Sequence, residues 1–446
     1  MPTSNPRLLA VKTLSKISNG AYSNLQLNQV IENSDLSSKD IGLLTNIVYG
    51  VIQHRLTLEY YLNHFLKNAD KVDDWVKELL YSAIYQMEYL DRVPDRAVFN
   101  ESIKIAKKMG HDGIRRLVTG VLHQIQRNGL PSFNEIKDPI EKLSIEYSVS
   151  EWIINELIDQ LGKDKALSIL ESINEPSKQS VRFNSKLITK QELVKKLTDE
   201  GYEVEDSKLV ESGLILSKKS ASYSQTFKDG EMTIQDESAM LPVESMDINA
   251  GDNILDACSA PGGKTTQIAE HLNVDDGGNV TALDLHDSRL RQVKKNAKRL
   301  AVNDVLSTKA CDARKLDDFY EDEFFDQILI DAPCSGIGLI RRKPEIRYEK
   351  TINDVNKLAS IQIDILNSAA KKLKIGGKLV YSTCTILNQE NSDVIDKFLS
   401  ENSNFKKVPV VSKMDVKLSD DYLRIFPDDF NSDGFFVCNL VKTGGE

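Results

Sequence analysis

Two cysteines follow apolar segments and have the surroundings expected of reactive thiols. Cys334 lies in Asp331-Ala332-Pro333-Cys334-Ser335-Gly336, and Cys384 lies in Tyr381-Ser382-Thr383-Cys384-Thr385. A cysteine is nucleophilic even when only a few per cent of it is ionised, so it suits attack on an electron-poor ring carbon. Both segments follow β-branched apolar runs typical of buried strands. We therefore expect both thiols at the same edge of one sheet.

A glycine turn between a predicted strand and a predicted helix is the candidate cofactor-binding segment. Its sequence from residue 256 is Asp-Ala-Cys-Ser-Ala-Pro-Gly-Gly-Lys-Thr. The glycines permit close backbone approach, and free N–H groups at the helix start suit an anionic or carboxylate ligand. A Walker A loop would need glycine in place of Cys258, and the GxGxxG fingerprint is absent. The expected cofactor contacts are Cys258, Ser259, Ala260, Pro261, Gly262, Gly263 and Lys264.

Two further aspartates follow the next strands. Asp284 ends the second strand, where an acid can bond a ribose hydroxyl pair. Asp312 follows the third strand, where a carboxylate can accept from an adenine amino group. A single aspartate at a strand end is more often a cap or turn residue. The succession of glycine turn and acids instead indicates a nucleoside cofactor with a charged tail, and S-adenosylmethionine fits best.

Alternating strands and helices must position these residues. From about residue 232 the pattern is βαβ-like, which predicts a mostly parallel sheet with ligands at the carboxyl ends of its strands. The last two strands are joined by a connection too short for a crossover helix, so they should form an antiparallel hairpin. The predicted strands lie near 253–256, 279–284, 306–310, 326–331, 377–382, 422–426 and 434–441; the helices lie near 264–272, 287–301, 354–373 and 389–400.

The preceding residues have a different texture. Residues 6–128 show apolar residues at helical spacing with almost no strand signal, which predicts an all-α bundle. A small α+β module follows, with short strands near 180–184, 202–205 and 213–216. The expected domains are therefore 1–135, 138–230 and 231–446.

Composition limits the protein class. The 446 residues carry a net charge of −10 and no apolar run of about 18 residues, and the N-terminus lacks a signal-peptide core. We expect a cytoplasmic protein without a membrane segment. Five cysteines without CxxC spacing argue against a disulfide framework or a zinc site, so no metal is expected. Residues 1–135 hold sixteen Lys/Arg against fourteen Asp/Glu, so RNA contact would depend on local basic patches.

Three motifs together resemble those of the RNA cytosine-5 methyltransferases. DACSAPGGKT, DAPCSGIG and YSTCT are similar to motifs I, IV and VI of that family. The resemblance covers about residues 180–446, including Arg182-Phe183-Asn184 and residues 234–238. It implies a Rossmann-like, S-adenosylmethionine-dependent α/β domain, with a seven-stranded, mostly parallel sheet and an antiparallel final hairpin.

The resemblance also implies roles for the thiols. Carbon 5 of cytosine becomes nucleophilic only after a thiolate adds at carbon 6, and the adduct must later be resolved. In the family the TC-motif cysteine attacks, so Cys384 would be the nucleophile and Cys334 would assist release; DNA enzymes use the PC-motif cysteine. Asp331 would bond the N3 and amino edge of cytosine and could also contact the cofactor. Lys264 is expected to pair with Asp331.

The N-terminal residues are similar to the NusB antitermination factor family. The clearest stretches are 93–108 and 118–122, where Thr119 replaces the usual asparagine. An amphipathic bundle with solvated basic side chains is the plainer interpretation. We favour the other interpretation, an RNA-facing patch that supplies phosphate contacts. Its members would be Lys104, Lys107, Lys108, Arg115 and Arg116.

A NusB-like domain joined to such a methyltransferase is the architecture of the Sun/Fmu type. That resemblance implies a bacterial 16S rRNA enzyme acting on cytosine 967 in the standard numbering. The base must be unstacked, so free or partly assembled rRNA is the expected partner, and we expect a monomer. A tRNA cytosine-5 methyltransferase and a catalytically inactive NusB-like RNA-binding protein are the alternatives.

Overall fold

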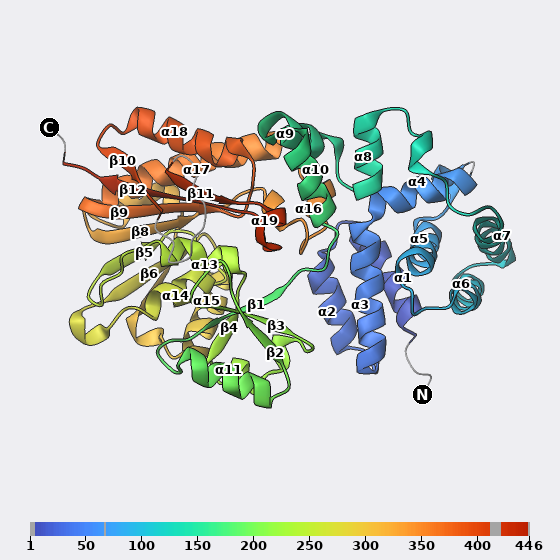
Figure 1. Cartoon of the computed structure of the whole chain (residues 1–446), viewed down its shortest axis with the longest axis horizontal. Coiled ribbons are helices and arrows are strands. Elements are labelled where there is room, and N and C mark those ends of the chain that lie inside the picture. Colours follow the sequence, from blue (N-terminus) through green and yellow to red (C-terminus); the bar gives the residue numbers. More distant parts are fainter. Residues whose placement is uncertain (1–4, 67, 411–420, 445–446) are drawn as a thin grey trace. The chain divides into compact units, whose positions relative to one another are not determined.

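The computed structural model describes residues 5–66, 68–410 and 421–444, and it divides the chain into two compact units (Figure 1). Unit 1 comprises Met1–Asp159 with Arg347–Glu349, and unit 2 comprises Gln160–Ile346 with Lys350–Glu446. None of the helices within the described ranges combines the length and apolarity needed to cross a bilayer.

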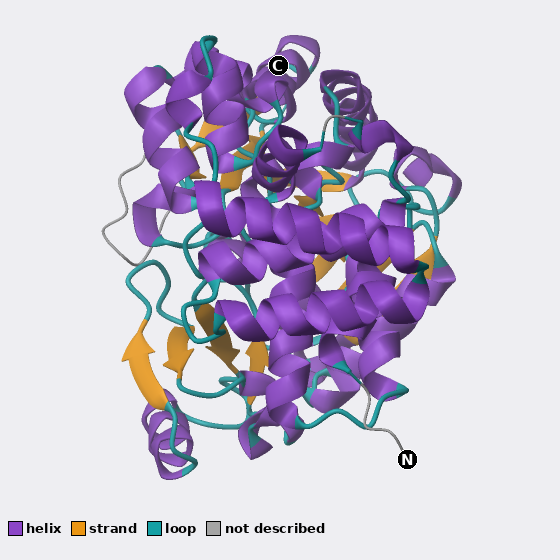
Figure 2. Ribbon diagram, turned by 90° about the vertical axis from the view of Figure 1, so that its right-hand side faces the viewer, coloured by secondary structure: helices purple, strands orange, loops and turns teal. Residues whose placement is uncertain are grey.

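Unit 1 is the predicted helical bundle, whose helices Figure 2 shows in purple. Helix α1 packs against α3 and α5, and α6 packs against α7. The apolar residues at helical spacing on α3, such as Leu44, Ile47 and Val51, are fully buried in the shared core. The helices are α1 (Pro6–Ile17), α2 (Ser23–Glu32), α3 (Ser38–Gln53), α4 (Arg55–Phe65), α5 (Asp74–Tyr89), α6 (Asp95–Met109), α7 (Asp112–Asn128), α8 (Pro139–Tyr147) and α9 (Glu151–Leu161).

A short segment from far along the chain belongs to unit 1. Residues Arg347–Glu349 lie in α16 (Ile346–Glu349). The Arg347 side chain is fully buried, and its Nη1 donates to the carbonyls of Gln53 at 3.1 Å and Tyr147 at 3.2 Å. The core of the bundle therefore includes residues from the second half of the sequence.

Unit 2 contains a small antiparallel sheet with strand order β2-β3-β1-β4. Three of its strands were predicted, but β4 was not, because three residues carry too little alternation to identify a strand. β4 pairs with β1 in the register Val181↔Ile234. The elements are α10 (Lys163–Ser172), β1 (Gln179–Phe183), α11 (Lys190–Asp199), β2 (Glu203–Asp206), β3 (Gly213–Ser217), α12 (Gln225–Lys228) and β4 (Met232–Ile234).

The large sheet of unit 2 has the order β10-β12-β9-β8-β5-β6-β7, with β11 paired to β12. The Rossmann-like parallel core and the antiparallel β11–β12 hairpin are confirmed. The expected number of seven strands was wrong, because the described residues contribute eight strands to the sheet. The missed strand, β10, is a four-residue edge strand with two lysines, a composition common at sheet edges. The strands are β5 (Asn253–Asp256), β6 (Asn279–Asp284), β7 (Leu306–Ala310), β8 (Phe325–Asp331), β9 (Leu373–Thr383), β10 (Phe405–Val408), β11 (Tyr422–Ile425) and β12 (Phe435–Lys442).

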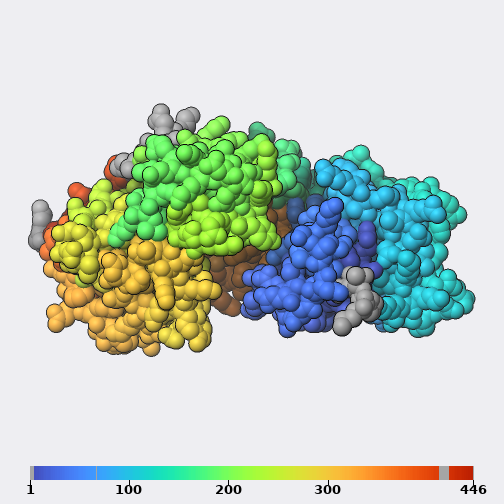
Figure 3. All heavy atoms as spheres, turned by 90° about the horizontal axis from the view of Figure 1, so that it is seen from below, coloured from blue at the N-terminus to red at the C-terminus, as the bar shows by residue number. Residues whose placement is uncertain are grey.

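Helices cover both faces of this sheet. Along β8, Ile328 and Ile330 pack in the core shared with α17 and α18, whereas Leu329 packs in the core shared with α13 and α14. Burial on both faces explains the nearly continuous apolar strands. In the space-filling view, the green atoms of the small module lie beside the yellow and orange atoms of the part of the chain that follows it (Figure 3). The helices are α13 (Glu237–Glu244), α14 (Gly263–Ala269), α15 (Asp287–Arg299), α17 (Ile352–Lys372), α18 (Ser392–Glu401) and α19 (Pro427–Phe430).

Candidate active site

Cys334 and Cys384 lie together at the carboxyl edge of the large sheet. They follow β8 and β9, which are parallel neighbours with Asp331 opposite Ser382. The two Sγ atoms are 3.3 Å apart, and both side chains are partly exposed. The hydrogen bond with Cys384, together with burial, raises the pKa of Cys334 well above its usual value. Cys334 is therefore held as a thiol at neutral pH.

Asp331 is the last residue of β8 and is held from two sides. Its Oδ2 accepts from Lys264 Nζ at 2.7 Å, and its Oδ1 accepts from Ser382 Oγ at 3.0 Å. The Lys264 ammonium also lies 4.8 Å from the ring centroid of Phe435. The predicted pairing of Lys264 with Asp331 is thus present. Asp331 remains about one-third exposed and has further lone pairs to offer a ligand.

The glycine turn after β5 is held tightly against its neighbours. Gly262 has φ of +102°, and a Cβ there would lie 3.0 Å from the Cα of Val293 on α15. Only glycine fits without moving a helix backbone. The N–H and Oγ of Ser259 donate to the carbonyl of Leu283 at 2.7 and 2.8 Å, which ties the turn to β6.

The other predicted residues of the 258–264 turn contact the elements around it. The carbonyl of Pro261 accepts from Asn296 Nδ2 at 2.9 Å, and Ala260 packs against the small cluster beneath α15. Burial raises the pKa of Cys258 well above its usual value, so Cys258 stays a neutral thiol in the wall of the site. Gly263 begins α14.

The two aspartates expected to bind the nucleoside of the cofactor, Asp284 and Asp312, lie at the carboxyl ends of β6 and β7. Asp284 is buried; its Oδ1 accepts from the backbone N–H of His286 at 2.9 Å, and its Oδ2 pairs with Arg289 at 3.1 Å. Asp312 follows β7, and hydrogen bonds from the Arg314 side chain lower its pKa. Each ionised carboxylate has about four acceptor positions, so both can take further hydrogen bonds.

The strand order arranges these residues in sequence along one edge. Across β9, β8, β5, β6 and β7 come Cys384, then Cys334 with Asp331, then the 258–264 turn, then Asp284 and Asp312. At about 4.8 Å per strand this edge is about 19 Å long. The thiols lie at one end and the acids at the other, with a close-approach glycine between them. This arrangement fits S-adenosylmethionine, whose nucleoside and amino acid ends need separate partners.

Two residues that the sequence analysis did not single out also contact the cysteine segments. Glu390 accepts from the backbone N–H of Ser335 at 2.8 Å, and Asn391 accepts from Thr383 Oγ1 at 2.5 Å. Both are fully buried. The only signal in the sequence is their polar character, six and seven residues after Cys384.

The predicted basic patch is divided between paired and unpaired side chains. Lys104 pairs with Glu101, and Arg115 pairs with Asp112. Within the described ranges, the exposed Lys107, Lys108 and Arg116 form no ion pair with an acidic side chain, and they extend from α6 and α7.

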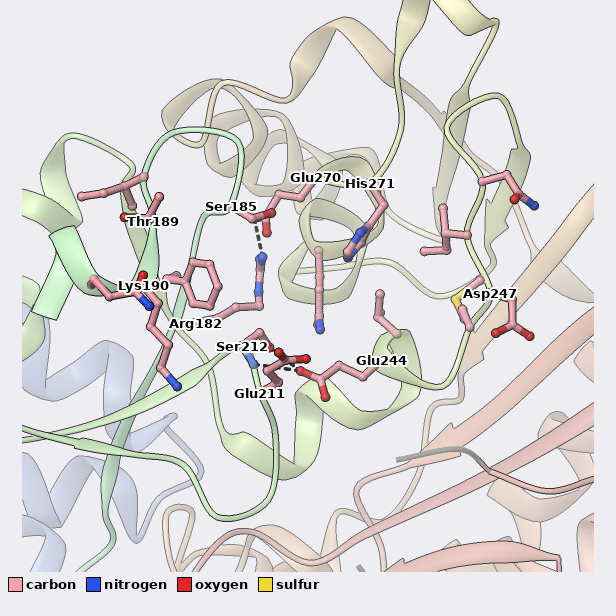
Figure 4. A pocket seen from close by; sticks show the side chains of 18 residues that line it. Arg182, Ser185, Thr189, Lys190, Glu211, Ser212, Glu244, Asp247, Glu270 and His271 are labelled. Carbon is pink, nitrogen blue, oxygen red and sulfur yellow. Dashed lines mark hydrogen bonds and ion pairs between the residues drawn. The ribbon is translucent and has the colours of Figure 1, made fainter. Parts of the chain in front are cut away.

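A cavity of about 840 Å3 in unit 2 lies away from the cysteines, between the small sheet and helices α13 and α14 (Figure 4). Its wall includes the buried ion pair of Arg182 and Glu270. Arg182 also donates to Gln235 at 3.0 Å and to the carbonyl of Gly263 at 3.4 Å. The Arg182-Phe183-Asn184 segment thus connects the small sheet to the start of α14.

Comparison with family models divides the chain into three successive matches. Residues 4–127 match the NusB family, residues 149–222 match the ferredoxin-like domain of RsmF/B-like methyltransferases, and residues 243–441 match 16S rRNA methyltransferase RsmB/F.

Among solved structures, PH0851 covers 99% of both chains with a TM-score of 0.83 and 25% identity. A methyltransferase homolog protein from Pyrococcus horikoshii covers 69% of this chain and 100% of its own, with a TM-score of 0.59 and 27% identity. The cofactor is therefore S-adenosylmethionine. This follows from the methyltransferase family model and the similar solved structures, together with the arrangement of residues along the carboxyl edge of the large sheet.

Two relatives match over nearly their whole length. The ribosomal RNA small subunit methyltransferase B of Pectobacterium atrosepticum is 31% identical, covering 98% of this chain and 99% of the relative. The probable ribosomal RNA small subunit methyltransferase B of Bacillus subtilis (strain 168) is 42% identical over 452 residues, covering 100% of both chains. With this agreement of domains, fold and full-length sequence, the chain belongs to the ribosomal RNA small subunit methyltransferase B family.

Proposed function

We propose that this protein methylates carbon 5 of a cytosine in 16S rRNA, through a covalent adduct between Cys384 and carbon 6. The observation that carries the proposal is the pair of thiols 3.3 Å apart beside Asp331, next to the cofactor turn. The names of the relatives support small-subunit rRNA as the substrate. The resemblance of the domain architecture to the Sun/Fmu type supports cytosine 967 as the target.

Cys384 begins the reaction as its thiolate, forming a bond to carbon 6 so that carbon 5 gains electron density. Asp331, held by Lys264 and Ser382, binds the N3 and amino edge of cytosine. Its carboxyl gives its proton to N3 as the ring gains electrons, and it takes the proton back when the adduct breaks. S-adenosylmethionine, when bound, supplies the methyl group as an electrophile.

The thiol pair also accounts for release. The Sγ atom of Cys334 lies 3.3 Å from the sulfur that holds the base, so Cys334 is within reach of the adduct. After losing its own proton to solvent, Cys334 removes the carbon-5 proton. The bond between carbon 6 and Cys384 then breaks, its electron pair returns to the Cys384 sulfur, and the aromatic ring is restored.

We assign a separate task to each of the three domains. Residues 1–135 act as a NusB-like RNA-binding domain, residues 138–230 form a connecting module, and residues 231–446 carry the chemistry. Because the target base must be unstacked, the substrate is 16S rRNA that is free or partly assembled. The enzyme acts in the cytoplasm as a monomer.

Methyl transfer to purified RNA tests this function. Wild-type protein, methyl-labelled S-adenosylmethionine and a 16S rRNA transcript should give label on carbon 5 of cytosine 967, and Cys384→Ala should give none. Label on tRNA alone would replace this proposal with a tRNA methyltransferase. Tight RNA binding without label on either RNA would indicate an inactive RNA-binding protein.

A further inference from the structure

Glu390 and Asn391 form a buried polar link between the two cysteine turns. Neither residue has measurable exposure. We propose that they are positioning residues that hold Cys334 and Cys384 at the distance needed for attack and release. The roles in attack and release rest on the proposed function. The distance between the two thiols can be tested without it.

Glu390 holds the turn that contains Cys334. Its Oε1 accepts from the backbone N–H of Ser335 at 2.8 Å, and its Oε2 accepts from the Ser335 hydroxyl at 2.5 Å. Gln362 of α17 donates both to Glu390 Oε1 at 3.2 Å and to the carbonyl of Pro333 at 2.9 Å. The residues on both sides of Cys334 are therefore bonded to one buried network.

Asn391 holds the segment that contains Cys384. Its Oδ1 accepts from Thr383 Oγ1 at 2.5 Å, and its Nδ2 donates to the carbonyl of Thr385 at 3.1 Å. One side chain thus bonds the residue before Cys384 and the residue after it. Two consecutive residues therefore hold the two cysteine segments separately.

Direct contacts join the two halves of the network. The hydroxyls of Ser335 and Thr385, each next to a cysteine, are 3.0 Å apart. The Tyr381 hydroxyl donates to the carbonyl of Glu390 at 2.7 Å, which ties the network to β9. Because the neighbours of the two cysteines are bonded to each other, this network restrains the two turns that carry the thiols.

A role in packing alone does not account for a carboxylate at this position. Burial raises the pKa of Glu390, so its ionised form is disfavoured there. An apolar side chain would avoid this cost, but it would leave the backbone N–H of Ser335 without its acceptor. We therefore infer that the carboxylate of Glu390 is present because its oxygens position the turn that contains Cys334.

Glu237 offers a matched control in the same unit. It is also buried, and its carboxylate also accepts from a serine hydroxyl, that of Ser207, at 2.5 Å. Burial raises its pKa as well. Its hydrogen-bond partner lies outside the cysteine turns, so substitution there reports the loss of a buried acid alone.

The first test measures whether the thiols still face each other, without any RNA. Diamide takes two electrons and two protons from a facing thiol pair, which becomes a disulfide, and peptide mapping quantifies the Cys334–Cys384 link. Glu390→Ala and Asn391→Ala should form this link at least about tenfold more slowly than wild type, because small displacements have large effects on reaction rates. Glu237→Ala should react at the wild-type rate.

The second test measures turnover. Glu390→Ala should lower kcat for methyl transfer at least about tenfold with an unchanged KM for S-adenosylmethionine, and Glu390→Gln, which keeps one acceptor, should recover part of it. If Glu390→Ala does not fold, Glu390→Gln takes its place in both tests. Wild-type rates of cross-linking in folded Glu390 and Asn391 variants would overturn the inference. Slow cross-linking in a protein that methylates no RNA would uphold the positioning role and reject the proposed function.

Discussion

The Sγ atoms of Cys334 and Cys384 lie 3.3 Å apart although fifty positions separate them in the chain. The contact arises because β8 and β9 are parallel neighbours joined through α17, so that their carboxyl ends meet. The hydrogen bond with Cys384, together with burial, raises the pKa of Cys334 well above its usual value. The proposed roles, nucleophile for Cys384 and release for Cys334, both depend on this contact.

Exchanging each cysteine for alanine should separate attack from release. Cys384→Ala should abolish the covalent complex with RNA that contains 5-fluorocytidine, because carbon 6 then has no nucleophile. Cys334→Ala should instead accumulate a covalent complex on unmodified RNA. Denaturing gel electrophoresis checks both outcomes, and Cys311→Ala, at a thiol outside the pair, is the control. A complex formed by Cys384→Ala but not by Cys334→Ala would reverse the assignment.

Loss of the Asp331 carboxylate should slow methyl transfer about 10²–10⁴-fold, the usual contribution of a proton-transferring group. Lys264→Met should have a smaller effect in the same direction, because Asp331 loses its 2.7 Å donor but keeps Ser382. Single-turnover rates at saturating RNA measure both. Lys378→Met, which removes a lysine paired with Asp247 elsewhere in the unit, should leave the rate unchanged. The variant that removes the carboxylate is Asp331→Asn. A methyl-transfer rate equal to that of the wild type would exclude a role for Asp331 in proton transfer.

Asp256 should make unit 2 less stable as pH rises. Burial raises its pKa from 3.8 to about 7. Between these values the folded chain keeps a proton that the unfolded chain has lost, so the free energy of unfolding falls as pH rises through this window. Asp256→Asn should show a smaller fall between pH 5 and pH 8 in urea unfolding. An identical fall in both proteins would contradict the raised pKa.

His54 should make unit 1 less stable in acid. Burial, with the charge of Arg347, lowers its pKa from 6.5 to about 4. Below pH 6.5 the unfolded chain gains a proton that the folded chain excludes, so stability falls as pH drops from 6.5 to 4. His54→Phe keeps a ring against Tyr89, at 4.1 Å in the wild type, and should remove part of this dependence in thermal unfolding. His123→Phe, at an exposed histidine of the same unit, should retain it.

Charge reversal at Lys107, Lys108 and Arg116 should weaken rRNA binding. If each side chain contacts one phosphate, the slope of log affinity against log salt should decrease in magnitude by about 3. The matched control reverses Lys12, Lys16 and Lys39, which are exposed on α1 and α3. Filter binding over a range of salt concentrations measures both triple variants. Equal slopes for the two variants would show that α6 and α7 do not form the RNA contact.

Strong local patterns made most elements predictable. The βαβ alternation after residue 232 gave the parallel sheet, and apolar residues at helical spacing gave the bundle. The strands that were missed, β4 and β10, are three and four residues long. Such short strands exist because a neighbouring strand supplies their hydrogen bonds, and no local pattern records that neighbour.

The sequence by itself determined which side chains follow each strand: two cysteines, a glycine turn and a series of aspartates. Their chemistry and spacing were enough to indicate a nucleoside cofactor and a thiol nucleophile. Only the tertiary structure decided that β9, β8, β5, β6 and β7 lie in this order, that the thiols are in contact, and that Glu390 and Asn391 hold them. It also decided that Arg347 completes the core of unit 1. The physical reason is that periodicity and residue type act within one element, whereas strand order and buried hydrogen bonds join elements far apart in the chain.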